Sequence, residues 1–109
     1  LSENISNSFF SERIQINSYD FFSISPRRLN CSLPGIVVLN PPYGRRLGLK
    51  SETAEQFRDI GRKLMLDFKG WRLAAILPDQ NTARVLNLQL NLKPLFHGGL
   101  DVFAGIGTI

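Results

Sequence analysis

Apolar residues along the chain recur with two different periods, those of strands and those of helices. Between Arg13 and Tyr19 apolar and polar residues alternate, which predicts a half-exposed edge strand. Gly35–Leu39 ("GIVVL") is an unbroken apolar run rich in β-branched residues, typical of a strand covered on both faces. Residues 21–35 contain proline and glycine breakers and predict a loop, and residues 1–10 predict the tail of a helix.

The period changes to that of a helix after Thr53. Thr53 and Gln56 have the spacing of a capping box, which predicts that the helix begins at Thr53. Gly70 stands where a glycine commonly ends a helix. Residues three and four positions apart form one apolar face of this helix: Ala54, Phe57, Gly61, Leu64 and Phe68.

The last third of the chain predicts one more buried strand, one short helix and two short strands. Trp71–Leu77 is the buried strand, and Trp71 is predicted to be a packing residue. Asp79 can cap a helix that runs to about Leu88, and two short strands flank His97–Gly99. This alternation predicts an α/β fold with parallel strands, in which ligands bind at the carboxyl ends of the strands.

Composition narrows the class of protein only a little. A chain of 109 residues that is 43% hydrophobic can form one modest core, hence one domain at most. It contains no apolar run of transmembrane length and no signal-peptide pattern. The single cysteine, Cys31, fits a reducing cytoplasm, and His97 has no companions for a metal site. The net charge of +4 is compatible with a polyanionic partner.

The most informative stretch is "NPPYG", which follows the apolar run directly. Two consecutive prolines fix the backbone and remove two N–H donors, so the chain becomes rigid where the predicted strand ends. An amide, Asn40, stands before them and an aromatic ring, Tyr43, stands after them. Taken alone these residues are also ordinary turn residues, so a tight turn is the alternative.

This motif and its flanks resemble a known enzyme family. "NPPYGRRLG" and "FRDIGRKLMLDFKGWRLAAIL" are similar to the ribosomal-RNA guanine N2-methyltransferases that carry a THUMP domain. The resemblance implies S-adenosylmethionine as cofactor and the C-terminal part of a Rossmann-like class I methyltransferase sheet. In that fold the strand order is 3-2-1-4-5-7-6, and the parallel strands are followed by a terminal antiparallel hairpin.

The chemistry of the family explains the motif. An exocyclic base amine is a poor nucleophile, because its lone pair is delocalised into the ring. The side-chain oxygen of Asn40 and the main-chain carbonyl oxygen of Pro41 would each accept a hydrogen bond from one N–H group of this amine. The prolines would hold that carbonyl still. The resemblance further implies a stacking ring against a flipped base, room beside that ring and contacts to RNA phosphates. Tyr43 would be the stacking ring, Gly44 would leave the room beside it, and Arg45 and Arg46 would contact the phosphates. Pro42 would help to hold the Pro41 carbonyl still.

Other charged residues have two interpretations each. By resemblance, Asp20 would accept a hydrogen bond from the cofactor adenine, with Phe21 beside the ring and Asn40 near the cofactor; alternatively Asp20 caps a turn. Arg45 and Arg46 could instead form ion pairs with glutamates of the following helix. The outer face of that helix carries Arg58, Asp59, Arg62 and Lys63. These residues predict a solvated, self-paired surface with Lys63 near Asp59, and an RNA-binding groove is the alternative.

Two further parts of the family's domain are expected upstream of Leu1. They are a glycine-rich cofactor loop and the first two strands of the sheet. Residues 1–109 would then be a partial methyltransferase domain, inactive alone. "LDVFAGIGTI" (Leu100–Ile109) resembles such a loop, with cofactor contacts at Gly105 and Gly107, but the terminal hairpin strand is favoured. Without two strands, the edge of Gly35–Leu39 would be bare, which predicts direct pairing with Arg13–Tyr19 or with another chain.

The predicted function is therefore methyl transfer to an exocyclic amino group, most specifically guanine N2 in ribosomal RNA. Adenine N6 methylation in DNA or RNA is the alternative within enzymes, because the motif does not distinguish the bases. A non-catalytic RNA-binding remnant, in which the motif is only a turn, is the alternative from another class. Expected partners are RNA or DNA, with no membrane, no metal and self-association through the strand edge.

Overall fold

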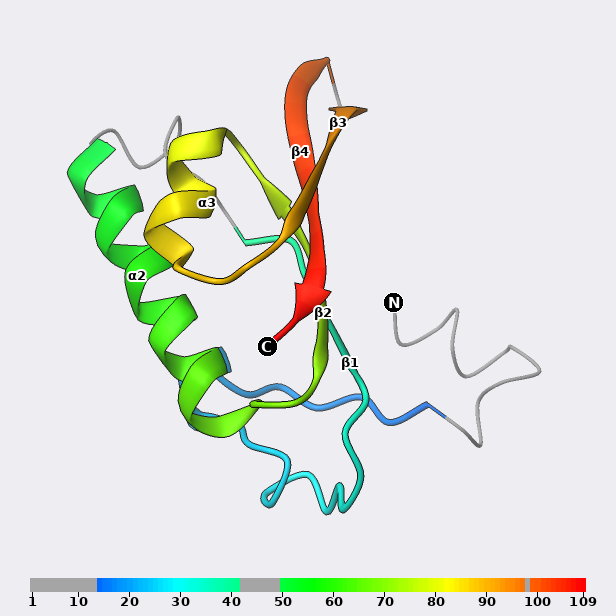
Figure 1. Cartoon of the computed structure of the whole chain (residues 1–109). Helices are drawn as coiled ribbons and strands as arrows, with labels where there is room; N and C mark the ends of the chain where they lie inside the picture. Colours follow the sequence, from blue (N-terminus) through cyan, green and yellow to red (C-terminus); the bar gives the residue numbers. More distant parts are fainter. Residues whose placement is uncertain (1–13, 42–49, 98) are drawn as a thin grey trace.

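A computed structural model describes residues 14–41, 50–97 and 99–109 as a four-stranded mixed sheet with helices packed on one face (Figure 1). The strand order is β1-β2-β4-β3. The strands are β1 (Ile36–Leu39), β2 (Arg72–Leu77), β3 (Asn91–His97) and β4 (Leu100–Thr108). The helices are η2 (Phe21–Ser23), α2 (Lys50–Asp67) and α3 (Gln80–Leu86).

The sheet has the order and directions that the resemblance implies. β1 is parallel to β2, with Leu39 opposite Ala75, and β4 is antiparallel to both β2 and β3. Placing β1 and β2 as strands 4 and 5 makes the hairpin β3–β4 strands 6 and 7, so the observed order corresponds to 4-5-7-6. The α/β class, the parallel pair and the terminal antiparallel hairpin are confirmed.

The apolar face of α2 was correctly predicted, but its start was not. Phe57, Leu64 and Phe68 are buried, and Gly70 has a positive φ of 90° just after the helix. The helix begins at Lys50, so Thr53 lies inside it and the predicted capping box is wrong.

The core lies between the sheet and the two helices. It joins one face of α2 to the alternate side chains of β2 and to Leu86 of α3. Trp71 packs at its margin, with its ring 5.4 Å from Phe68 in an edge-on arrangement, which confirms its predicted packing role. The buried members are Phe57, Ile60, Leu64, Phe68, Leu73, Ala75, Leu77 and Leu86.

Helices α2 and α3 approach closely at Gly61. A Cβ atom on Gly61 would overlap the carbonyl oxygen of Leu86, which is backbone and cannot turn aside. We expect Gly61→Ala to lower the free energy of unfolding by about 1–2 kcal/mol, because overpacking outweighs the better helix propensity of alanine. Urea unfolding measures this, with the exposed Leu66→Ala of the same helix as control; equal stability of Gly61→Ala and the unmodified chain would contradict the close contact.

The segment Leu100–Ile109 forms a strand, as favoured, and not a cofactor loop. β4 pairs with β3 from Leu100 to Ile106 and with β2 from Phe103 to Thr108, with Gly105 opposite Ala75 and Gly107 opposite Leu73. A Cβ on Gly107 would lie 2.6 Å from the carbonyl oxygen of Gln89, and one on Gly105 would meet leucine side chains at 3.0–3.1 Å. The glycines therefore allow the chain before β3 to lie against β4, and the glycine-rich-loop alternative is wrong.

The predicted strand Arg13–Tyr19 is not present in its described part. Residues 14–19 have no regular secondary structure, and Arg13 lies outside the described residues. An alternating pattern forms a strand only when a neighbour accepts its hydrogen bonds, and within the described ranges β1 pairs with β2 alone. Pairing of Arg13–Tyr19 with the edge of β1 is thus wrong for the residues that can be seen.

Pairing of the outer edge of β1 with another chain stays a prediction. Among the described residues no strand pairs with this edge, and neither a charge nor a proline interrupts β1. Ile36 and Val38 on one face of this strand are 60% and 75% exposed, so the prediction of a strand covered on both faces is wrong. We expect the isolated 109-residue chain to associate with increasing concentration in sedimentation velocity, and Val38→Lys to reduce that association. A constant monomer for the unmodified chain would contradict pairing through this edge.

Candidate functional site

The candidate site begins where β1 ends. Asn40 and Pro41 follow Leu39 directly, at the carboxyl end of a strand that is parallel to β2. The Asn40 residue is exposed and Pro41 is half-buried. The edge formed by the carboxyl ends of parallel strands is the usual ligand-binding edge of α/β sheets. An exposed amide there can offer its oxygen to a ligand.

The neighbouring parallel strand also ends at this edge, in a turn that begins α3. Only Pro78 and Asp79 separate β2 from α3. Asp79 caps the helix as predicted, because its Oδ1 accepts hydrogen bonds from the Thr82 N–H at 2.7 Å and the Thr82 hydroxyl at 2.8 Å. This carboxylate is engaged in holding α3, while Asn40 stands at the adjacent strand end.

The remaining residues of the motif lie outside the described part of the chain. These predicted site residues are Pro42, Tyr43, Gly44, Arg45 and Arg46. Their roles therefore stay predictions from the sequence and the resemblance.

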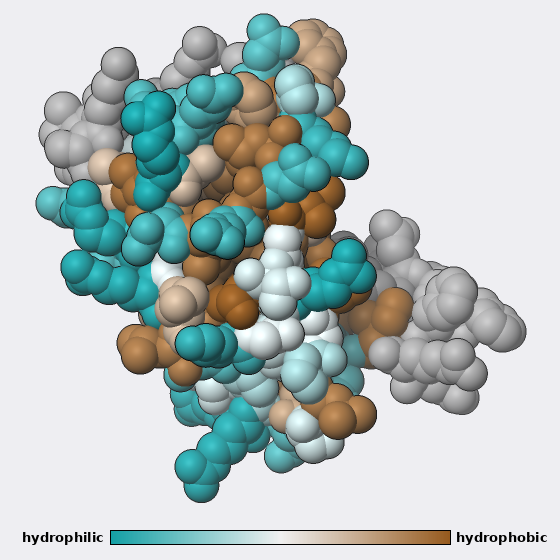
Figure 2. All heavy atoms as spheres, in the orientation of Figure 1, coloured by the Kyte–Doolittle hydropathy of each residue, from teal (hydrophilic) through white to brown (hydrophobic). Residues whose placement is uncertain are grey.

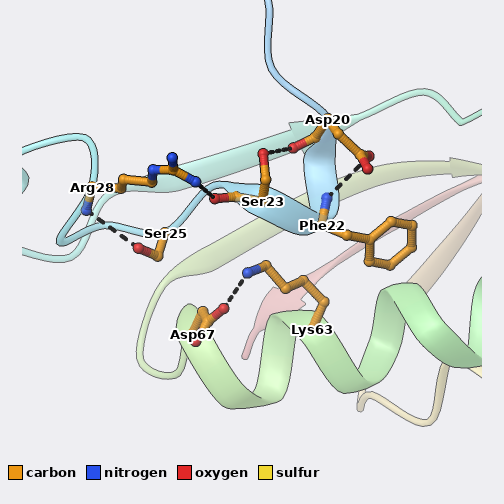
Figure 3. A network of polar contacts seen from close by, with 7 residues as sticks. All are labelled: Asp20, Phe22, Ser23, Ser25, Arg28, Lys63 and Asp67. Atoms are coloured by element: carbon orange, nitrogen blue, oxygen red, sulfur yellow. Dashed lines mark hydrogen bonds and ion pairs between the residues drawn. The ribbon is translucent and has the colours of Figure 1, made fainter.

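Asp20 adopts the turn-capping role that was its alternative interpretation. Its carboxylate accepts a hydrogen bond from the N–H of Phe22 at 3.3 Å, and its carbonyl accepts one from the Ser23 hydroxyl at 2.8 Å (Figure 3). One carboxylate oxygen is used in this way, so the exposed group keeps capacity to accept a further hydrogen bond. A cofactor contact is compatible with this cap.

The structure does not bring Asp20 and Asn40 together. The turn that Asp20 caps lies beside the second half of α2, near Lys63 and Asp67, in both views (Figures 1 and 3). Asn40 instead follows the carboxyl end of β1, whereas the end of α2 is followed by the start of β2, which lies opposite the start of β1. All hydrogen bonds described for Asp20 stay within its own turn.

Of the two aromatic residues after Asp20, Phe21 is the less exposed. Phe21 packs against the core cluster, whereas Phe22 is 46% exposed, and their rings meet edge-on at 5.2 Å. The exposed ring beside the carboxylate is therefore that of Phe22, which sequence reasoning did not select. The doubled "FF" was the available signal, since two neighbouring rings of a short turn seldom both face the core.

The charged face of α2 is partly self-paired, with different partners from those predicted. Lys63 pairs with Asp67, not with Asp59, and Arg62 lies 3.9 Å from Asp59. The alternative interpretation of this face, an RNA-binding groove, is supported by one further basic residue from another helix. Arg84 of α3 lines the same groove as Arg58 and Arg62, which no pattern along the sequence could reveal.

Comparison with known proteins defines the class of this domain. A family model described as the RMKL-like methyltransferase domain matches residues 2–101. The chain therefore belongs to the RMKL-like methyltransferase domain family. The mixed sheet, with its parallel pair and antiparallel hairpin, agrees with that assignment.

Among curated proteins the chain is similar to ribosomal RNA large subunit methyltransferases K/L. It is 31% identical to that of Shewanella baltica over 107 residues, which is 97% of this chain and 14% of the relative. The match to the Shewanella oneidensis protein is 28% identical over 107 residues, with the same shares. For Colwellia psychrerythraea it is 36% over 66 residues, or 61% of this chain and 9% of the relative. The chain thus spans about a seventh of the first relatives' length.

In the part of the chain that the structure describes, none of the helices has the length and hydropathy needed to cross a membrane.

Proposed function

We propose that this chain forms the target-base side of a methyltransferase domain that modifies ribosomal RNA. The reaction is methyl transfer from S-adenosylmethionine to an exocyclic amino group, specifically the N2 of a guanine. The observation that supports this proposal most directly is the position of Asn40 and Pro41 at the carboxyl end of β1, beside the parallel strand β2. The relatives named as ribosomal RNA large subunit methyltransferases supply the substrate class.

The acceptors of this chain prepare the amine. The Asn40 side-chain oxygen and the Pro41 carbonyl oxygen each accept a hydrogen bond from one N–H group of the base amine, and together they orient its nitrogen. Fixed acceptors of this kind need no rearrangement during the reaction. S-adenosylmethionine supplies, when bound, an electrophilic methyl group. The nitrogen–carbon bond forms as the carbon–sulfur bond breaks, and the amine then releases one proton to water.

The remaining motif residues hold the flipped nucleotide. Tyr43 stacks on the base, Gly44 leaves room beside the ring, and Pro42 keeps the Pro41 carbonyl in place. Arg45 and Arg46 contact phosphates next to the target. Asp20 remains the proposed acceptor for the cofactor adenine, with an aromatic ring of the same turn beside it.

The domain as a whole needs more than these residues. We place the glycine-rich cofactor loop and the first two strands of the sheet outside residues 1–109, so that this stretch alone is inactive. The expected location is the cytoplasm, where ribosomal RNA is available.

The proposed function is tested with the full-length protein, isotope-labelled S-adenosylmethionine and ribosomal RNA that lacks the modification. Nucleoside mass spectrometry should find the label in N2-methylguanosine. Label in N6-methyladenosine would favour the adenine alternative and overturn the guanine assignment. No transfer, together with no binding of S-adenosylhomocysteine in calorimetry, would favour a non-catalytic remnant.

A further inference from the structure

Two helices bring basic side chains together around one groove. The α2–α3 groove, about 600 Å³ in volume, is bordered by Arg58 and Arg62 of α2 and Arg84 of α3. All three arginines are exposed, and the apolar residues Met65 and Leu66, both exposed, also line this groove. Figure 2 shows this face, where hydrophilic surface over the helices surrounds hydrophobic surface.

A second groove adjoins the first one and is bordered by amides. The α3–β3 groove, about 700 Å³ in volume, shares Arg84 and Asn87 with the α2–α3 groove. It is also lined by the amide-bearing residues Gln80, Gln89 and Asn91. Guanidinium and amide groups thus form one continuous surface across α2, α3 and the start of β3.

The charges of this surface are not balanced locally. Among the described residues that line either groove there is no aspartate or glutamate. The nearest recorded pairing is between Arg62 and Asp59, at 3.9 Å, with side chains 70% and 58% exposed. An exposed pair at this distance contributes little and leaves the guanidinium available to another anion.

The chemistry of these groups narrows the choice of ligand. A guanidinium group matches phosphate oxygens with two parallel hydrogen bonds, and amides read the edges of bases as both donors and acceptors. The exposed apolar residues of the same groove can receive the face of an unpaired base. An acidic peptide would also match the arginines and amides, and it is the proposed ribosomal RNA substrate that favours RNA here.

The location relates this surface to the site of methyl transfer. α3 begins at Gln80, three positions after β2 ends and at the same carboxyl edge of the sheet as Asn40, and Arg84 lies about one turn further along it. We infer that the α2–α3 and α3–β3 grooves bind single-stranded RNA that continues from the methylated nucleotide over the helices, with phosphates at Arg58, Arg62 and Arg84. This inference rests on the proposed function, since it needs an RNA substrate.

The test compares two triple variants of the full-length protein. The first carries Arg58→Gln, Arg62→Gln and Arg84→Gln. The matched control carries Arg27→Gln, Lys69→Gln and Arg72→Gln, which remove the same charge from exposed residues that line neither groove. Affinity for ribosomal RNA is measured from low to high salt, because each phosphate contact contributes about 0.7–0.9 to the slope of log affinity against log salt.

We expect the groove variant to lower that slope by about 2–3 and the control to change it by less than about 1. The groove variant should also raise the KM for RNA while kcat at saturating RNA stays near that of the unmodified protein. A slope equal to that of the control, or a loss in kcat with an unchanged KM, would overturn the inference.

A charge-preserving variant separates binding from folding. Arg58→Lys, Arg62→Lys and Arg84→Lys together should restore the slope, because lysine also contacts phosphates. Failure of lysine to restore the slope would overturn the inference even if the glutamine variant unfolds. If the unmodified protein neither binds nor methylates ribosomal RNA, the proposed function itself fails, and the groove inference fails with it.

Discussion

Asn40→Ala in the full-length protein is expected to lower turnover by a factor on the order of 10²–10³, the loss seen when one of two preorganised hydrogen-bond partners is removed from an active site. The variant keeps the Pro41 carbonyl but loses the side-chain oxygen that orients the amine. RNA binding should change little, because the phosphates and the stacked base supply most of the affinity. Methyl transfer at saturating RNA measures the effect.

Two further variants show which property of Asn40 matters. Asn40→Asp keeps an acceptor oxygen and should retain more turnover than Asn40→Ala. Asn17→Ala is the control, because Asn17 is an exposed asparagine outside the motif. Near-normal turnover of Asn40→Ala would contradict the assigned mechanism and leave the motif as a turn.

Tyr43→Ala is expected to weaken engagement of the target base by about 1–3 kcal/mol, the range for stacking of a base on an aromatic side chain. Tyr43→Phe keeps the ring and should therefore change binding only slightly. Fluorescence of 2-aminopurine at the target position reports base flipping, since the signal rises when the base leaves its stack.

The phenylalanine variant decides between the ring and the hydroxyl. An equal loss for Tyr43→Phe and Tyr43→Ala would show that the hydroxyl carries the effect, and would contradict the stacking role. Tyr19→Ala, which removes an exposed tyrosine before the capped turn, serves as a control for nonspecific loss of an aromatic residue.

Local signals predicted most of the helices and strands, but not the packing of every one. The apolar run before Asn40 forms β1, although one face of this strand is exposed where its pattern predicts cover on both. The period of three and four places Phe57, Leu64 and Phe68 in the core as predicted. Asp79 caps α3 as predicted, because a helix cap needs only a short side-chain acceptor within reach of the free N–H groups that follow it in the sequence.

The predictions that failed depend on distant partners. The alternation in Arg13–Tyr19 is compatible with a strand, but residues 14–19 have no strand beside them to pair with in the described structure. The helix start at Thr53 was inferred from the change of period and a capping-box spacing, whereas α2 continues back to Lys50.

The candidate site was predicted only in part for the same reason. The motif at the end of β1 is a local signal, and its strand-end position follows from the sequence. The grouping of Arg84 with Arg58 and Arg62 arises from the crossing of two helices, where Gly61 lets α3 approach. Nothing in the spacing of these residues along the chain indicates that they meet.

The central claim is that the end of β1 holds a base amine with two acceptors. The most direct test is a crystal structure of the full-length protein with S-adenosylhomocysteine and an RNA oligonucleotide that contains the target guanosine. The account predicts the exocyclic nitrogen at about 2.7–3.2 Å from both the Asn40 side-chain oxygen and the Pro41 carbonyl oxygen. A flipped guanine bound beside the cofactor, with its amine in contact with neither oxygen, would contradict it.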